Sequence, residues 1–324
     1  MSERYARQLV LPQIGVAGQA RLARSAVLVV GAGGLGCAVL PYLCAAGVGR
    51  LVIVDPDRVE ESNLHRQPLY RMSELGRPKA EAARDALIER NREVRIEARV
   101  ERLTPANARA LIDPVDLAID AADSFAASYV LSDECQRAGK PLVSASVLGL
   151  SGYVGAFCAG APSYRAVFPE MPRQAGSCAQ AGVLGTAVGV MGTLQAHVTL
   201  ALLLKLEPCV LGQLVTVDFQ TLRFGGFDFL GAREPEDDSL AFIAPEQVRA
   251  GDIVVDLRSR TEAPTSPWAA SVRLSVDEIE AGAGEWSAEP RVVLCCRTGV
   301  RAWRAARALQ RRGHPNVALI AFGD

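Results

Sequence analysis

The sequence has no surplus of charge of either sign and no recognisable targeting segment. Its 324 residues carry 35 Lys and Arg against 36 Asp and Glu, which gives no reason to expect binding to nucleic acid or to an anionic membrane. The polar start, Met1–Tyr5, is not typical of a leader. Repeats and low-complexity tracts are absent. With eight scattered cysteines, the chain is expected in a reducing cytoplasm, where a special cysteine acts by reactivity rather than in a disulfide.

One apolar stretch, residues 182–204, is long enough to span a bilayer. Gln195 and His197 interrupt it, and no basic cluster precedes it. We therefore predict a buried helix that crosses the core of a large α/β domain, rather than a membrane span.

A glycine-rich turn follows the apolar run Ala26–Val30 and precedes a helical pattern. Glycines allow the backbone to turn tightly and to approach a phosphate, and a helix N-terminus offers free N–H groups to an anion. The glycines concerned are Gly31, Gly33, Gly34 and Gly36. By itself, this fingerprint predicts only that a nucleotide binds.

Strand and helix patterns alternate along the first 150 residues, which predicts an α/β fold with a doubly wound, Rossmann-like sheet. From Gly152 to Phe168 the pattern becomes strand-rich, so we expect the sheet to be mixed. The acidic stretch 231–240 is typical of a linker. We thus predict a nucleotide-binding domain over 1–230 and a small second α/β domain over 241–324.

Charged and amide side chains after the second predicted strand distinguish among nucleotides. Asp55 ends that strand, where an acid commonly binds ribose hydroxyls, although it could instead cap the turn to Asp57. Further along come two side-chain amides and two cations, which suit a triphosphate better than a nicotinamide cofactor. These residues are Asn63, Arg66, Gln67 and Lys79.

Another acid, Asp123, follows the predicted strand Leu117–Asp120. Ligands of open α/β sheets bind at the carboxyl ends of the strands, and a carboxylate there could hold a magnesium ion that bridges phosphates. The alternative role is an N-cap for the helix that starts near Phe125, and the two roles are compatible.

Taken in order, these motifs resemble the MoeB/ThiF family, bacterial relatives of ubiquitin-activating enzymes. The resemblance runs from about residue 3 to about residue 230. It is carried by Arg4-Tyr-Ala-Arg7-Gln, Gly31–Gly36, Asp55-x-Asp57, Ser62-Asn-Leu-x-Arg66-Gln, Gly76-x-Pro-Lys79, Asp123-Ser-Phe and Ser177-Cys178-Ala-Gln-Ala-Gly.

The resemblance implies a reaction and a set of roles. ATP and magnesium would be used to adenylate the C-terminal glycine of a ubiquitin-like sulfur-carrier protein that ends in Gly-Gly. Asp55 would hold the ribose and Asp123 the metal, while Asn63, Arg66 and Lys79 would contact phosphates. Arg7 resembles an arginine that reaches the partner's ATP, which implies a homodimer.

Two cysteine features of the family differ in what they imply here. Cys178 matches a loop cysteine that is covalently active in some members and dispensable in others, and both roles stay open. Relatives also carry a structural zinc on two Cys-x-x-Cys pairs. Ser163 and Ala166 stand where the first pair belongs, and residues 233–238 contain no cysteine. We therefore predict no zinc.

The second domain resembles a shortened rhodanese-like sulfurtransferase. Asp256-Leu-Arg258 follows one predicted strand, and a loop from Cys296 to Arg301 opens a helix. Backbone N–H groups at such a loop are expected to lower the pKa of the Cys296 thiol and to stabilise a persulfide. Cys295 is expected to be an ordinary buried strand residue. Because the segment after Arg258 is compressed, the domain could also be inactive.

The leading hypothesis is therefore carrier adenylation coupled to thiocarboxylate formation, with a cysteine desulfurase or another sulfur donor. The attached domain favours a molybdopterin-type product over thiamine. Three alternatives remain open. They are a non-catalytic or regulatory carrier-binding relative, an NAD-dependent oxidoreductase, and an enzyme that adenylates an RNA-linked carboxylate, which the near-neutral charge does not favour.

Overall fold

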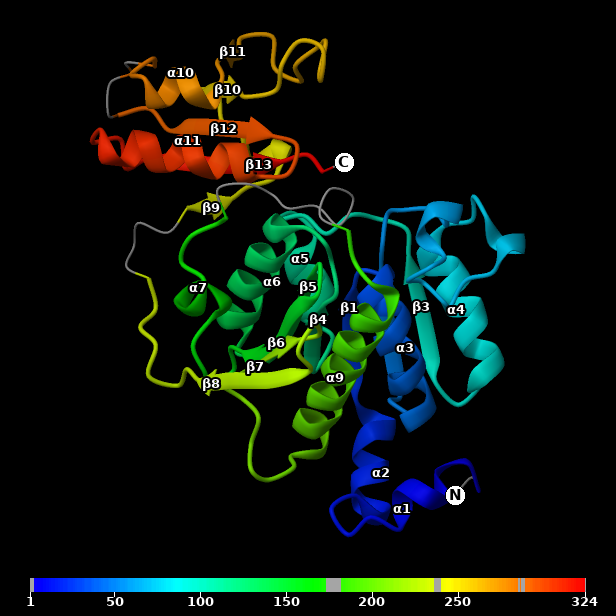
Figure 1. Cartoon of the computed structure of the whole chain (residues 1–324). Helices are drawn as coiled ribbons and strands as arrows, with labels where there is room; N and C mark the ends of the chain where they lie inside the picture. The colour runs from blue at the N-terminus through cyan, green and yellow to red at the C-terminus, as the bar shows by residue number, and fades with distance from the viewer. Residues whose placement is uncertain (1–2, 173–181, 236–239, 285, 287–288, 324) are drawn as a thin grey trace.

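Two separate β-sheets organise the chain in the computed structural model, which describes residues 3–172, 182–235, 240–284, 286 and 289–323 (Figure 1). The larger sheet has eight strands in the order β3-β2-β1-β4-β5-β6-β7-β8. Its strands are β1 (Ala26–Val30), β2 (Arg50–Val54), β3 (Arg95–Arg99), β4 (Leu117–Asp120), β5 (Leu142–Leu148), β6 (Ser151–Phe157), β7 (Gln213–Asp218) and β8 (Arg223–Asp228).

This sheet is parallel from β3 to β5 and antiparallel from β5 to β8. The doubly wound fold with a mixed sheet is thus confirmed. Its helices are α1 (Ala6–Leu9), α2 (Gly15–Arg24), α3 (Gly34–Ala46), α4 (Lys79–Arg90), α5 (Ala108–Ile112), α6 (Phe125–Ala138), α7 (Tyr164–Val167) and α9 (Gly185–Leu204). The short helix α7 lies in the stretch that the sequence pattern assigned to strands.

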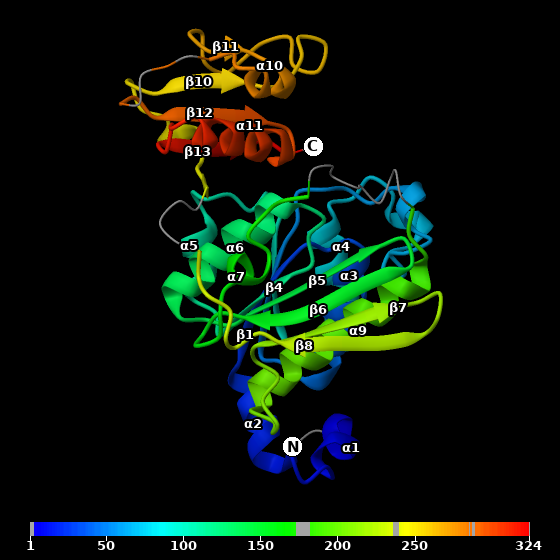
Figure 2. The same cartoon turned by 60° about the vertical axis from the view of Figure 1, so that its left-hand side comes forward.

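Alternate residues of the central strands pack on opposite faces of the larger sheet, as strand geometry requires. Val27 and Val29 of β1 belong to a core cluster with α3 and α9, whereas Leu28 and Val30 belong to a cluster with α5 and α6. Because both faces are covered by helices, these strands are apolar throughout rather than alternating. Figure 2 shows the two layers of helices with the sheet between them.

Helix α9 is the apolar stretch that could be mistaken for a membrane span. Within the described part of the chain it is the one helix long and apolar enough to cross a bilayer, with 56% of its most apolar window buried. It packs along α3 and against β5 and β6. The buried helix predicted from Gln195 is therefore present, and that side chain has no exposed surface.

The smaller sheet has five parallel strands in the order β11-β10-β12-β13-β9. They are β9 (Ala241–Phe242), β10 (Ile253–Asp256), β11 (Val272–Arg273), β12 (Val292–Cys296) and β13 (Val317–Ala321), with helices α10 (Val276–Glu280) and α11 (Val300–Arg311). Sequence patterns predict strands at 253–256, 291–295 and 316–320 and a helix at 300–312, which correspond to β10, β12, β13 and α11, whereas the two-residue strands were missed. The exact domain limits 1–230, 231–240 and 241–324 stay a prediction.

The Gly36→Ala substitution should destabilise the first domain, because a Cβ at Gly36 would clash with the carbonyl oxygen of Gly31. We expect a loss of about 1–3 kcal/mol in the free energy of unfolding, measured by urea denaturation. The control is Gly189→Ala, a helix-interior site where the described residues place no atom within 4 Å of the new Cβ apart from the backbone of the same helix, and a gain of up to about 1 kcal/mol is expected. Equal stability of the two variants would contradict the packing argument.

Candidate active site

The glycine turn lies between β1 and α3, at the carboxyl edge of the parallel strands. Gly31 has a φ of +100°, and a Cβ there would lie 2.6 Å from the carbonyl carbon of Ala121, just after β4. The turn is therefore pressed against the chain that leads to Asp123, and only glycine fits. Gly33 is different, since a Cβ there would meet only the side-chain amide of Gln67, 3.7 Å away.

Asp55 fastens this turn to the end of β2. One of its carboxylate oxygens accepts a hydrogen bond from the Ala32 N–H (2.7 Å), and the other accepts one from the Asp57 N–H (2.8 Å). The two roles expected for Asp55 were ribose binding and capping of its own turn. The capping of its own turn is observed, and ribose binding stays a prediction. Burial raises the pKa of the Asp55 carboxyl, while the Ala32 N–H and the nearby Lys79 oppose that rise.

The predicted phosphate contacts gather beside the turn. Lys79 begins α4 with its side chain only 7% exposed, and its Nζ lies 3.0 Å from a carboxylate oxygen of Asp57. Arg66 places its Cγ 3.7 Å from the Cβ position of Gly34, and its guanidinium donates to the Asn63 side-chain oxygen (2.6 Å). Two cations thus flank the glycines, as a triphosphate requires.

Gln67 provides a test of whether this turn suits a ligand. Its side chain is 2% exposed, and its Oε1 has no hydrogen-bond partner among the described residues. A buried acceptor without a donor is costly. A nucleotide hydroxyl or amino group bound beside the turn could satisfy it, so the residues present fit a nucleotide.

Asp123 is exposed and follows β4 at the same edge of the sheet. The alternative role as N-cap was wrong, because the N-cap of α6 is Ser124 and no side-chain capping hydrogen bond is formed. The Asp123 carboxylate is thus left available, and its hard oxygen ligands suit Mg²⁺.

Asp120, the last residue of β4, was not singled out from the sequence. It is fully buried, and its carboxyl accepts hydrogen bonds from the Ser144 hydroxyl (2.8 Å) and from the Ala122 N–H (3.3 Å). Burial raises its pKa to about 6. The side chain therefore holds the loop that carries Asp123. An acid at the end of a buried strand was the signal available in the sequence.

Two predicted residues lie outside this cluster. Arg7 is exposed in α1, at the end of the molecule opposite the second sheet (Figure 1), so it does not join the turn within one chain. Cys178 lies outside the described residues.

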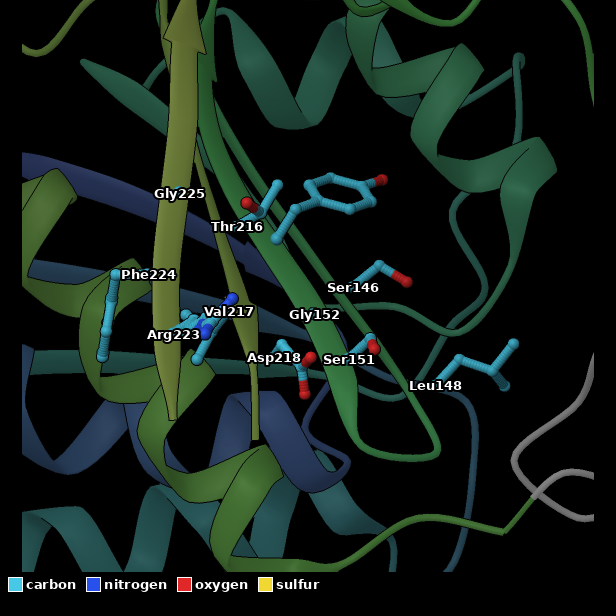
Figure 3. A pocket seen from close by; sticks show the side chains of 11 residues that line it. Ser146, Leu148, Ser151, Gly152, Thr216, Val217, Asp218, Arg223, Phe224 and Gly225 are labelled. Atoms are coloured by element: carbon cyan, nitrogen blue, oxygen red, sulfur yellow. The ribbon is translucent and has the colours of Figure 1, made fainter. Parts of the chain in front are cut away.

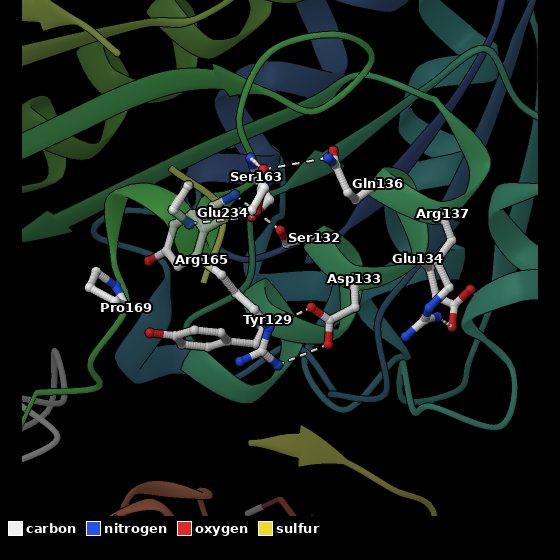
Figure 4. Close-up of polar contacts among 12 residues, drawn as sticks. Tyr129, Ser132, Asp133, Glu134, Gln136, Arg137, Ser163, Arg165, Pro169 and Glu234 are labelled. Carbon is white, nitrogen blue, oxygen red and sulfur yellow. Dashed lines mark hydrogen bonds and ion pairs between the residues drawn. The ribbon is translucent and has the colours of Figure 1, made fainter. Parts of the chain in front are cut away.

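The two segments in which we predict no zinc ligands, around Ser163 and over residues 233–238, contact each other through a hydrogen-bonded carboxylate. The Glu234 carboxylate accepts hydrogen bonds from the backbone N–H (2.6 Å) and the hydroxyl of Ser163 (Figure 4). In the part of the chain that the structure describes, no group of three or more His, Cys, Asp or Glu could hold a metal. The absence of zinc itself stays a prediction.

Cys296 is the last residue of β12 and is fully buried. Its Sγ accepts from the N–H groups of Gly299 (3.1 Å) and Ala302 (3.4 Å), so the expected cradle of backbone donors is present. The expected pKa direction was wrong. Burial raises the pKa of the Cys296 thiol and outweighs these donors. Cys295 faces the opposite core, where burial raises its pKa to about 12.

Two hollows lie apart from the glycine turn. One, of about 600 Å³, lies on the antiparallel part of the larger sheet (Figure 3) and is lined by residues such as Ser146, Tyr153, Thr216 and Arg223. None of its lining residues is a predicted nucleotide ligand. The other, of about 450 Å³, lies at the carboxyl edge of the smaller sheet and contains Arg301. Sequence patterns indicated neither hollow, because each is lined by residues that are distant in the sequence and meet only in the folded domain.

The raised pKa of Asp120 makes a prediction about stability. A carboxyl whose pKa is higher in the folded than in the unfolded chain stabilises the fold at low pH, and that contribution is lost as pH rises from about 4 to above 6. Relative to wild type, Asp120→Asn should therefore gain about 2 kcal/mol in the free energy of unfolding between pH 4.5 and 7.5, because part of the full effect falls below pH 4.5. Urea denaturation at both pH values measures this, and a constant difference would contradict it.

Comparisons with known proteins agree with this geometry. The ThiF family model matches residues 5–239. The sulfur carrier protein adenylyltransferase of Thermus thermophilus is 45% identical over 224 residues, 67% of this chain and 83% of the relative. The adenylyltransferase and sulfurtransferase MOCS3 of Culex quinquefasciatus is 33% identical over 374 residues, 99% of this chain and 85% of the relative.

The match to other relatives is partial, since the chain spans about half the length of several MOCS3 proteins. Among solved structures, E. coli MccB with ATP superimposes with a TM-score of 0.61 at 20% identity, over 73% of this chain and 74% of that one; this shows the fold alone. The family model and the two relatives of high coverage together show that this chain belongs to the ThiF family.

Proposed function

We propose that this protein adenylates the C-terminal carboxylate of a ubiquitin-like sulfur carrier with ATP, and that its second domain supplies sulfur to the activated carrier. The observation that carries the proposal is the meeting of the glycine turn, Asp55, Arg66, Lys79 and Asp123 at one edge of the larger sheet. Membership of the ThiF family and the adenylyltransferase activity for which the relatives are named support the same reaction.

In the first step, a carboxylate oxygen of the carrier attacks the α-phosphorus of ATP. The bond from that phosphorus to the pyrophosphate oxygen breaks, and pyrophosphate leaves with the electron pair. Arg66 and Lys79 would stabilise the charge on the departing phosphates, and the backbone N–H groups of the turn would orient them. Asp123 would hold Mg²⁺, which would neutralise further phosphate charge.

In the second step, the terminal sulfur of a Cys296 persulfide attacks the acyl carbon. A carbon–sulfur bond forms, the bond to the AMP oxygen breaks, and AMP leaves. A thiol reductant then attacks the Cys296 sulfur, which forms a disulfide and releases the carrier thiocarboxylate. The persulfide itself comes from a sulfane-sulfur donor, such as the persulfide of a cysteine desulfurase.

The same proposal includes a homodimer, in which Arg7 reaches the partner's ATP. It also includes a molybdopterin-type product.

Loss of Asp123 should abolish the first step. We expect Asp123→Ala to reduce carrier-dependent ATP–pyrophosphate exchange by about 100-fold or more, because the electrostatic stabilisation of the phosphates is lost. Asp113→Asn is the matched control, since Asp113 is an exposed acid after α5. Unchanged exchange in Asp123→Ala would remove Asp123 from the site.

Loss of Cys296 should separate the two steps. Cys296→Ala should keep pyrophosphate exchange but form no carrier thiocarboxylate, because the sulfur-carrying atom is gone. Cys295→Ala changes the neighbouring thiol on the opposite face of β12 and should keep both activities. The thiocarboxylate is measured by the mass of the intact carrier, which is about 16 Da greater when sulfur replaces oxygen. Sulfur transfer by Cys296→Ala would exclude Cys296 as the carrier of sulfur.

A further inference from the structure

One face of α11 is built to contact the first domain. Trp303 on this helix is 2% exposed, and its ring lies 5.0 Å from the ring of Tyr129 on α6. The guanidinium of Arg165 lies over both rings, 4.7 Å from the Tyr129 centroid and 5.8 Å from that of Trp303. Phe242 of β9 packs beside the same pair. A large aromatic ring so fully covered by another domain indicates a specific interface.

Polar contacts fix the orientation of that interface. The Trp303 indole N–H donates to the Glu170 carboxylate (3.0 Å), and Arg307, one turn further along α11, pairs with the same carboxylate (2.9 Å). Arg165 is itself held by a two-pronged pair with Asp133 of α6 (Figure 4). Glu170 comes shortly before residues 173–181, which include Cys178.

One residue of the Cys296 loop lies at the same interface. Gly299, whose N–H donates to the Cys296 sulfur, faces outward onto the first domain and β9. A Cβ at Gly299 would lie 2.8 Å from the Phe242 ring and 3.5 Å from the Cβ of Ala126. Ala126 is in the first turn of α6, three residues after Asp123. The loop therefore lies beside the helix that begins two residues after the predicted magnesium ligand.

We propose that Trp303 and Glu170 are positioning residues, whose contact docks the second domain so that the Cys296 loop is closed against the first turn of α6. When the domains separate, the Cys296 sulfur becomes accessible. The consequence for catalysis rests on the proposed function: sulfur would be loaded onto Cys296 in the open state, and docking would return the loop to the adenylation site of the same chain.

The test is the rate at which iodoacetamide alkylates each cysteine of the full-length chain, resolved by peptide mass spectrometry. The chain provides its own references. Cys209 is exposed, Cys37 is buried in the first domain, and Cys295 is buried on the other face of β12. In the wild type, Cys209 should react fast, whereas Cys37, Cys295 and Cys296 should react slowly. This measurement needs no carrier, ATP or catalytic activity, so its failure is distinct from failure of the proposed function.

Trp303→Ala should accelerate alkylation of Cys296 by about tenfold, the loss expected from one aromatic pair and its hydrogen bond. Glu170→Gln, which alters only the first domain, should accelerate it less and in the same direction. Both should leave Cys209, Cys37 and Cys295 unchanged. Glu280→Gln is the matched control, because Glu280 pairs with Arg304 on the side of α11 that faces α10; it should behave as wild type.

Three outcomes would overturn the proposal. The first is Cys296 reacting as fast as Cys209 in the wild type, because the loop would then not be closed. The second is unchanged Cys296 reactivity in both interface variants. The third is equal acceleration of Cys295 and Cys296 in Glu170→Gln, since unfolding of the second domain, rather than undocking, would then expose the thiol.

Discussion

The close approach of three backbone segments at the end of β1 is the constraint on which the site depends. Gly31 turns with a positive φ against the carbonyl of Ala121, and the Asp55 carboxylate holds the next N–H, that of Ala32. These contacts fix the ends of β1, β2 and β4 relative to one another. The helix α3 therefore begins where its free N–H groups face the space in which the phosphates are predicted to bind. A side chain at Gly31 or Gly36 would push these segments apart. The predicted ATP-binding residues that they carry would then move apart as well.

The sequence was most informative where local patterns and spatial position coincide. Parallel strands end at one edge of a sheet, so residues such as Asp55 and Asp123 could be brought together from strand order alone. Lys79 followed from the motif Gly76-x-Pro-Lys79. Asp120 was missed because its role depends on Ser144 of the neighbouring strand and on its full burial, and a single sequence shows neither contact.

In the second domain, the loop motif predicted the contacts of the Cys296 thiol but not the direction in which its pKa shifts. The spacing from Cys296 to Arg301 predicted the donor groups correctly, since Gly299 and Ala302 both point N–H groups at the sulfur. It did not predict the net pKa direction, because desolvation depends on what packs over the loop. That packing comes partly from another domain. Trp303 likewise gave no signal in the sequence, since an aromatic residue on an amphipathic helix is ordinarily part of its own domain's core.

One helix connects the two chemical centres. Asp123 precedes α6, Ala126 contacts the Gly299 position, and Tyr129 packs on Trp303. Ala126 and Tyr129 are three residues apart, so they lie on one side of the helix. Docking on this side would place the sulfur loop over the end of the helix at which the adenylate is proposed to form. On that proposal, Cys296 stays closed to reagents while the domains are docked and becomes accessible when they part.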